Sequence, residues 1–85
     1  MRILLCHQEQ ATRQHMASIL RAAGHEILVA CDGEEAMRLS NGAFDVLLID
    51  LLLPKRDGLQ VIAELGNQYR RPTILLSDIA LRPLK

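Results

Sequence analysis

The sequence predicts an α/β fold in which the strands of a parallel sheet alternate with helices. Four apolar runs rich in branched side chains are too short for helices and are typical of strands: residues 3–6, 27–30, 46–49 and 73–76. Their nearly continuous apolar character indicates strands covered on both faces, as in a parallel sheet. Helical spacing and capping residues separate the runs, and this alternation favours right-handed crossovers with helices on both faces.

The first two strands enclose the most regular predicted helix. Apolar residues recur at three- and four-residue spacing through residues 12–23, and Gly24 follows where a left-handed residue would end the helix. The second strand, residues 27–30, is a candidate edge of the sheet. After it, Asp32 and Glu35 form a capping-box pattern, which predicts a short second helix through Leu39.

The third strand leads into a turn and a third helix. Asp50 directly follows residues 46–49, and Pro54 then breaks the chain. Asp57 can cap the next helix. The apolar stripe of that helix consists of Leu59, Ile62 and Leu65. The strand at residues 73–76 completes a β-α-β-α-β-α-β order.

Length and composition limit both the core and the partners. With 85 residues and no repeat or linker, the chain is predicted to form one small domain, residues 1–85, whose core is aliphatic because only Phe44 and Tyr69 are aromatic. Ten basic and ten acidic residues cancel, which argues against nucleic acid or an anionic membrane as a partner. Because no apolar stretch is long enough to span a membrane and no signal peptide is evident, we predict a cytoplasmic protein.

Two smaller features have simple structural interpretations. Cys6 and Cys31 lack the spacing of a disulfide scaffold or a redox pair, so both are predicted to be buried structural cysteines. The basic doublet Arg70-Arg71 is predicted to lie in a solvated loop.

Polar residues at the carboxyl ends of the strands are the candidates for function. Ligands of an open parallel sheet bind outside these ends, near the point where the strand order reverses. Asp50 is the strongest candidate, because rigid backbone would hold an accessible carboxylate there, although it also fits a loop-start residue bonded to local backbone. His7, Gln8 and Glu9 follow the first strand, and Ser77 follows the fourth.

The loop after the third strand resembles the phosphorylation loop of the receiver domains of two-component response regulators. Asp50 is followed by Pro54 and then by Asp57-Gly58, as in that family. Further matching segments are residues 2–5, 22–26 and 32–36, and the resemblance extends from Met1 to about Ser77. It implies a flavodoxin-like sheet of order 2-1-3-4-5 and phosphoryl transfer from a sensor histidine kinase onto an aspartate, here Asp50.

The resemblance also implies a Mg²⁺ site, which this sequence supports only in part. In the family, the acceptor aspartate and two acidic residues at the end of the first strand hold the metal, together with the backbone carbonyl that corresponds to Leu52. His7 and Gln8 occupy the two acidic positions, and Glu9 occupies the next one. Two negative charges that would balance the metal are therefore missing, so we expect a weakened Mg²⁺ site and assign no cofactor.

The end of the sequence departs from the family pattern. Ser77 matches the hydroxyl residue that would contact the phosphoryl group, although a turn residue explains it equally well. We expect the chain to lack the fifth strand, with its phosphate-pairing lysine, and the last helices. The predicted sheet order is then 2-1-3-4, and the uncovered apolar face favours a homodimer.

Two functions remain open. The favoured one is a degenerate receiver, or pseudo-receiver, that acts in phosphorelay regulation by binding a sensor histidine kinase or another signalling protein. The alternative is a functional receiver phosphorylated on Asp50. We assign no catalytic residues and predict no enzymatic activity, since residues 6–11 lack the glycines of a dinucleotide site and Ser77 lacks those of a nucleophile elbow.

Overall fold

The predicted alternation of strands and helices is confirmed. The computed structural model describes residues 1–66 and 71–76. In chain order its elements are β1 (Arg2–Cys6), α1 (Gln10–Ala22), β2 (Glu26–Ala30), α2 (Gly33–Leu39), β3 (Val46–Asp50), α3 (Gly58–Leu65) and β4 (Thr73–Leu76). None of the helices in these residues is long and apolar enough to cross a membrane.

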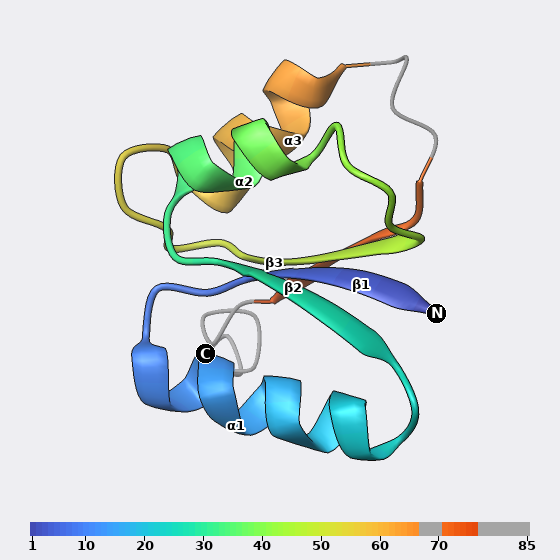
Figure 1. Ribbon diagram of the computed structural model, residues 1–85. Coiled ribbons are helices and arrows are strands. Elements are labelled where there is room, and N and C mark those ends of the chain that lie inside the picture. Colours follow the sequence, from blue (N-terminus) through green and yellow to red (C-terminus); the bar gives the residue numbers. More distant parts are fainter. Residues whose placement is uncertain (67–70, 77–85) are drawn as a thin grey trace, which may run out of the picture.

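The four described strands form a parallel sheet of order β2-β1-β3-β4, as predicted. In the register, Leu4 of β1 lies between Leu28 of β2 and Leu47 of β3. Among these four strands, the strand at residues 27–30, extended by one residue, is at one edge as expected, and β4 is at the other. Figure 1 shows α1 on one face of the sheet, with α2 and α3 together on the other.

The core lies mainly between the sheet and the pair α2 and α3, and it is aliphatic apart from one ring. Its buried residues are Leu4, Cys6, Ala30, Ala36, Phe44, Leu47, Ile49, Leu53 and Val61. Side chains alternate between the faces of a strand. Ile3 and Leu5 therefore point from β1 to the α1 side, where Ala17 is also buried.

Each helix ends or begins at a residue that the sequence pattern selected. Gly24, at φ 96°, donates its N–H to the carbonyl of Arg21, and this bond closes the end of α1. Asp32 accepts from the Glu35 N–H at 2.8 Å at the start of α2. Asp57 accepts from the Gln60 N–H at 2.8 Å at the start of α3.

Two expectations about side-chain burial were wrong. Cys31 is exposed, because it follows β2 at the sheet edge, whereas Cys6 is buried as predicted. Arg71 does not extend into solvent: its guanidinium stacks 4.4 Å from the Phe44 ring centroid and donates to the Ser40 carbonyl at 2.8 Å. A planar guanidinium can donate to a carbonyl at the end of α2 and stack on an aromatic ring at the same time. Arg70 lies outside the described residues.

Candidate functional site

The parallel sheet brings His7 and Asp50 to the same rim. We call this rim, where β1 and β3 end at their carboxyl termini, the β1–β3 rim. The two strands are neighbours, and Cys6 lies beside Ile49 in the register. The residues that follow this pair, His7 and Asp50, therefore face each other across the rim. The strand order reverses here, because the chain runs from β1 to β2 on one side and then crosses back to β3 on the other side of β1. Open α/β sheets bind ligands at such a point.

Asp50 is buried and held by its own loop. Its side chain is 12% exposed, and its Oδ1 accepts the backbone N–H of Leu52 at 3.2 Å. The loop closes behind it, where the Gly58 N–H donates to the carbonyl of Leu51 at 2.9 Å. A side chain at position 58 would not fit, since a Cβ atom there would lie 2.5 Å from the Asp50 carbonyl oxygen.

The imidazole ring of His7 lies against the Asp50 carboxylate. Its Nε2 is 3.6 Å from Asp50 Oδ2, and the His7 side chain is only 16% exposed. The backbone N–H of Glu9 donates to His7 Nδ1 at 3.1 Å, so in the neutral ring the proton is on Nε2, the atom that faces Asp50. Arg13 of α1 fixes the backbone by donating to the His7 carbonyl at 2.8 Å.

The other two rim candidates from the first strand do not join this pair. Gln8 and Glu9 are both exposed. The Glu9 carboxylate instead accepts a hydrogen bond from the Thr12 hydroxyl at the start of α1. The sequence could not show this bond, because it depends on how the chain turns from β1 into α1.

The donor set of the rim fits Mg²⁺ poorly. Mg²⁺ takes oxygen ligands in octahedral geometry, often from carboxylates. Asp50 supplies one carboxylate here, and beside it stands an imidazole that presents an N–H. Within residues 1–66 and 71–76, no group of three or more His, Cys, Asp and Glu side chains could hold a metal ion. The Leu52 carbonyl is the remaining candidate ligand on this loop, and Ser77 lies outside the described residues.

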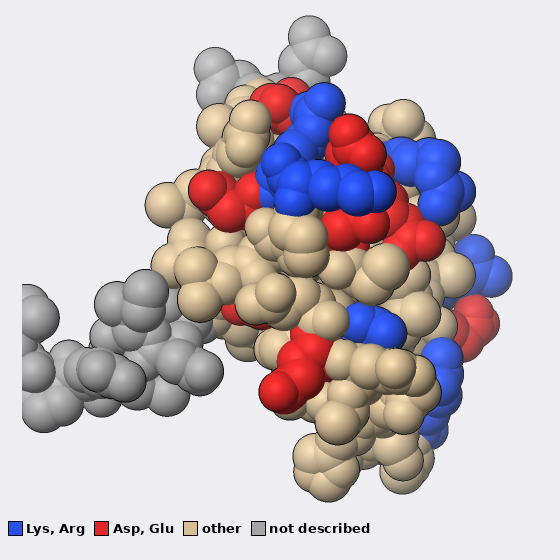
Figure 2. All heavy atoms as spheres, turned by 90° about the vertical axis from the view of Figure 1, so that its left-hand side faces the viewer, with Lys and Arg blue, Asp and Glu red and all other residues tan. Residues whose placement is uncertain are grey.

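An ion-pair cluster lies beside this loop, and the sequence pattern did not predict it. Figure 2 shows positive and negative side chains interleaved over the upper part of the face that carries the rim loops. In the cluster, Lys55 Nζ lies 3.6 Å from Asp32 Oδ2 and 3.6 Å from Glu34 Oε1. The nearby carboxylates raise the pKa of Lys55, with the larger effect from Asp32 and the smaller one from Glu34. The signal available in the sequence was a lysine directly after Pro54, where the chain must turn.

A parallel sheet with this strand order, helices on both faces and a held aspartate at the switch point defines a flavodoxin-like domain of the receiver type. The family profile described as "response regulator receiver domain" matches residues 3–81. The chain belongs to this family.

Curated relatives support the same assignment. The transcriptional regulatory protein CpxR of Klebsiella pneumoniae is 33% identical over 76 residues, which are 89% of this chain and 33% of CpxR. The transcriptional regulatory protein PdtaR of Mycobacterium tuberculosis is 32% identical over 85 residues, which are 98% of this chain and 42% of PdtaR. The chain therefore spans between a third and a half of the length of these two relatives.

Solved structures of receiver domains share the fold. The receiver domain of a Francisella response regulator has a TM-score of 0.86 at 31% identity, with 89% of this chain and 64% of that chain covered. The receiver domain of a Pseudomonas aeruginosa sensor histidine kinase, solved with magnesium coordinated in its active site cleft, has a TM-score of 0.87 at 29% identity. The latter match covers 95% of this chain and 70% of that one.

Proposed function

We propose that this chain is a degenerate receiver module of two-component signalling, which acts by binding another signalling protein and not by metal-dependent phosphorylation of Asp50. The observation that carries the proposal is the 3.6 Å approach of His7 Nε2 to Asp50 Oδ2. An imidazole N–H faces the carboxylate where the family pattern has an acid. We accordingly propose no enzymatic activity for the chain.

Charge balance supports this proposal. Opposite unit charges about 4 Å apart attract by about 4 kcal/mol at an effective dielectric constant of 20. Replacing two carboxylates by His7 and Gln8 therefore removes more attraction for Mg²⁺ than a neutral amide oxygen returns. Glu9 offers no replacement, because its carboxylate is engaged by Thr12.

The alternative function is a receiver that is phosphorylated on Asp50. Its support is the intact loop, in which the Leu52 N–H and the close-packed Gly58 hold Asp50 in place. A similar protein, the Thermotoga maritima response regulator TrrA, was solved in complex with Mg²⁺ and a BeF group, which also supports this alternative. TrrA is 32% identical to this chain, with a TM-score of 0.83. That match covers 89% of this chain and 68% of TrrA.

Phosphoryl donors distinguish these two functions. The natural chain and Asp50→Asn are incubated with acetyl phosphate and Mg²⁺, and intact mass spectrometry measures the gain of a phosphoryl group. We expect no adduct on either protein. An adduct on the natural chain that is absent from Asp50→Asn would refute the degenerate function and establish the alternative.

We propose a sensor histidine kinase or another signalling protein as the partner, and a homodimer formed through the sheet face beside α1. On that face Ile74 of β4 is 52% exposed and lies beside Leu48 in the register. Light scattering over a range of concentrations should show dimers for the natural chain and monomers for Ile74→Glu. Leu59→Glu is the matched control, since Leu59 is 57% exposed on α3, which packs on the other face. A natural chain that remains monomeric would contradict the homodimer.

The remaining expectations about setting are proposals of the same kind. A formal net charge of zero supports a protein partner over nucleic acid. The cytoplasmic location predicted from the sequence stays a prediction.

A further inference from the structure

Lys55 has a backbone conformation that lysine rarely adopts. Its φ is 67°, and it is the only non-glycine residue with positive φ within residues 1–66 and 71–76. In this region the Cβ atom of an L-residue crowds the backbone, so the conformation costs free energy that glycine would avoid. Such a conformation is kept where the surrounding structure stabilises it, and for Lys55 the side chain makes stabilising contacts.

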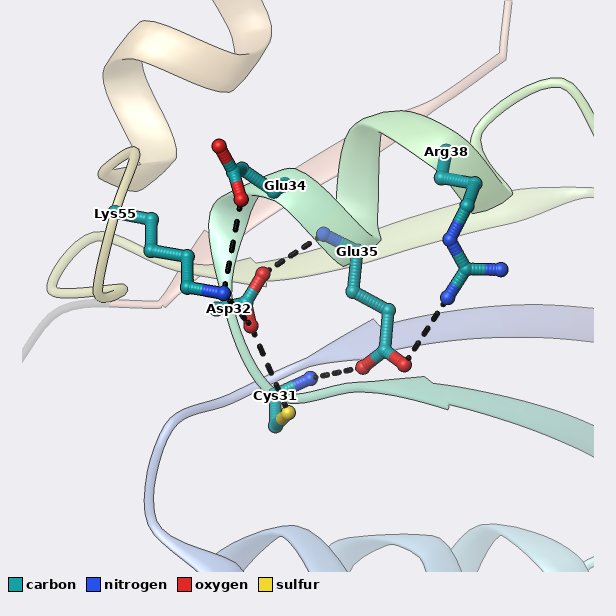
Figure 3. Close-up of polar contacts among 6 residues, drawn as sticks. All are labelled: Cys31, Asp32, Glu34, Glu35, Arg38 and Lys55. Atoms are coloured by element: carbon teal, nitrogen blue, oxygen red, sulfur yellow. Dashed lines mark hydrogen bonds and ion pairs between the residues drawn. The ribbon is translucent and has the colours of Figure 1, made fainter.

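The Lys55 side chain joins two elements that are distant in the sequence. Its ammonium group lies 3.6 Å from a carboxylate oxygen of Asp32 and 3.6 Å from one of Glu34, at the start of α2 (Figure 3). We call this arrangement the Lys55 clasp. Asp32 is at the same time the N-cap of α2 and accepts from the Glu35 N–H, so the clasp attaches to a fixed point.

The backbone makes a second connection between the same two segments. The Gly33 N–H donates to the Pro54 carbonyl at 3.0 Å. The contact is so close that a Cβ atom on Gly33 would lie 2.0 Å from the Arg56 carbonyl oxygen. The loop between β3 and α3 therefore packs directly on the start of α2, with Lys55 at the centre of the contact.

We propose that Lys55 is a positioning residue that clasps the loop after Asp50 to α2 and so holds the Leu52 amide against the Asp50 carboxylate. The loop has fixed ends, Asp50 in β3 and the capped start of α3 at Asp57. Leu53 anchors it in the core, but Leu52 is 52% exposed and has no such anchor in its side chain. The clasp limits how far the loop can lift at its exposed turn.

This inference deepens the proposed function, on which it rests in one respect: the loop holds Asp50 beside His7 in one arrangement, as a constitutive binding module requires. The ion pairs of the clasp do not include Asp50, so they can form whether or not Asp50 is modified.

Hydrogen exchange of the Leu52 amide, followed by NMR, tests the clasp. Lys55→Met keeps much of the aliphatic stem and removes the charge, and Lys55→Arg restores the charge. Arg38→Met is the matched control, because Arg38 pairs with Glu35 on α2 at 3.3 Å and, within the described part of the chain, makes no hydrogen bond or ion pair with the loop. The Leu4 amide in the central strand β1 serves as the reference for global opening.

We expect Leu52 exchange to rise about two- to fivefold relative to Leu4 in Lys55→Met, the range that follows from losing exposed ion pairs. Lys55→Arg should return it to the natural rate, and Arg38→Met should leave it unchanged. An unchanged ratio in Lys55→Met, no recovery in Lys55→Arg, or an equal rise in Arg38→Met would overturn the proposal. A purely structural role would change both amides together. Phosphorylation of Asp50 in the acetyl phosphate assay would overturn the degenerate function alone and leave this result standing.

Discussion

Replacing Gly58 by alanine should destabilise the domain although Gly58 is the first residue of a helix. A Cβ atom at this position would lie 2.5 Å from the Asp50 carbonyl oxygen and 3.0 Å from Leu51 Cα, and both distances are shorter than the ordinary contact range of 3.4–4 Å. Both neighbours are backbone atoms, so no flexible side chain can move aside. The start of α3 or the end of β3 must shift instead.

The size of the effect follows from two opposing terms. Overpacking of this kind costs about 1–3 kcal/mol. Replacing a glycine whose conformation alanine can adopt returns about 0.4–1 kcal/mol through the unfolded chain. We therefore expect Gly58→Ala to lower the free energy of unfolding by about 1–2 kcal/mol, and the midpoint of thermal unfolding by about 5–15 °C.

Circular dichroism during urea and thermal unfolding measures this loss. Gly24→Asn is the control, because a Cβ atom at Gly24 would meet nothing within 4 Å and asparagine tolerates its positive φ better than other residues do. The control should lose less stability than Gly58→Ala. A Gly58→Ala protein as stable as the natural chain would refute the close packing of the loop that holds Asp50.

Three further predictions concern residues outside the rim. Arg71→Ala should lower the free energy of unfolding by about 1–3 kcal/mol in urea titrations, because it removes the stacking on Phe44 and a charged hydrogen bond; a loss below about 0.5 kcal/mol would contradict these contacts. The hydrogen bond from the Glu35 N–H lowers the pKa of Asp32, and the nearby charge of Lys55 lowers it further; the resulting stabilisation is present above the carboxyl's unfolded pKa and is lost as the pH falls through the lowered folded pKa. Asp32→Asn should flatten the stability profile between these two pKa values, and an unchanged profile would argue against the cap. Burial raises the pKa of Cys6 to about 12, so a thiol reagent should modify only Cys31 in the native chain and both cysteines after unfolding; rapid modification of both in the native state would contradict the core.

The fold followed from local patterns because each element carries its own signal. Residues 3–6 and 46–49 were predicted as strands from apolar runs, and the observed strands differ by one residue at one end. Gly24 and Asp57 marked helix termini through chemistry that acts within a few residues. The parallel arrangement followed from the alternation of strands and helices, and the strand order followed from the resemblance to receiver domains.

The candidate site was predictable only in its coarse geometry. The meeting of His7 and Asp50 follows from the neighbouring parallel strands, since His7 directly follows β1 and Asp50 is the last residue of β3. The orientation of the imidazole depends on the Glu9 N–H. The Glu9 carboxylate does not join the rim, because it accepts a hydrogen bond from Thr12. These bonds are set by the turn into α1, which apolar periodicity does not describe.

Lys55 and Arg71 were missed for a related reason. Each acts on a segment that is distant in the sequence: Lys55 on Asp32, and Arg71 on Ser40 and Phe44. A charged residue in a loop is most often solvated, so composition alone favours the solvated interpretation. Tertiary packing decides otherwise here.

Titration of Mg²⁺ into the natural chain and into the double variant His7→Asp/Gln8→Asp would show whether His7 and Gln8 deprive the rim of a Mg²⁺ site. The Leu52 amide resonance, next to the Asp50 carboxylate, reports binding. We expect a saturable shift in the double variant and none in the natural chain at millimolar Mg²⁺. A saturable shift of equal midpoint in both proteins would contradict it.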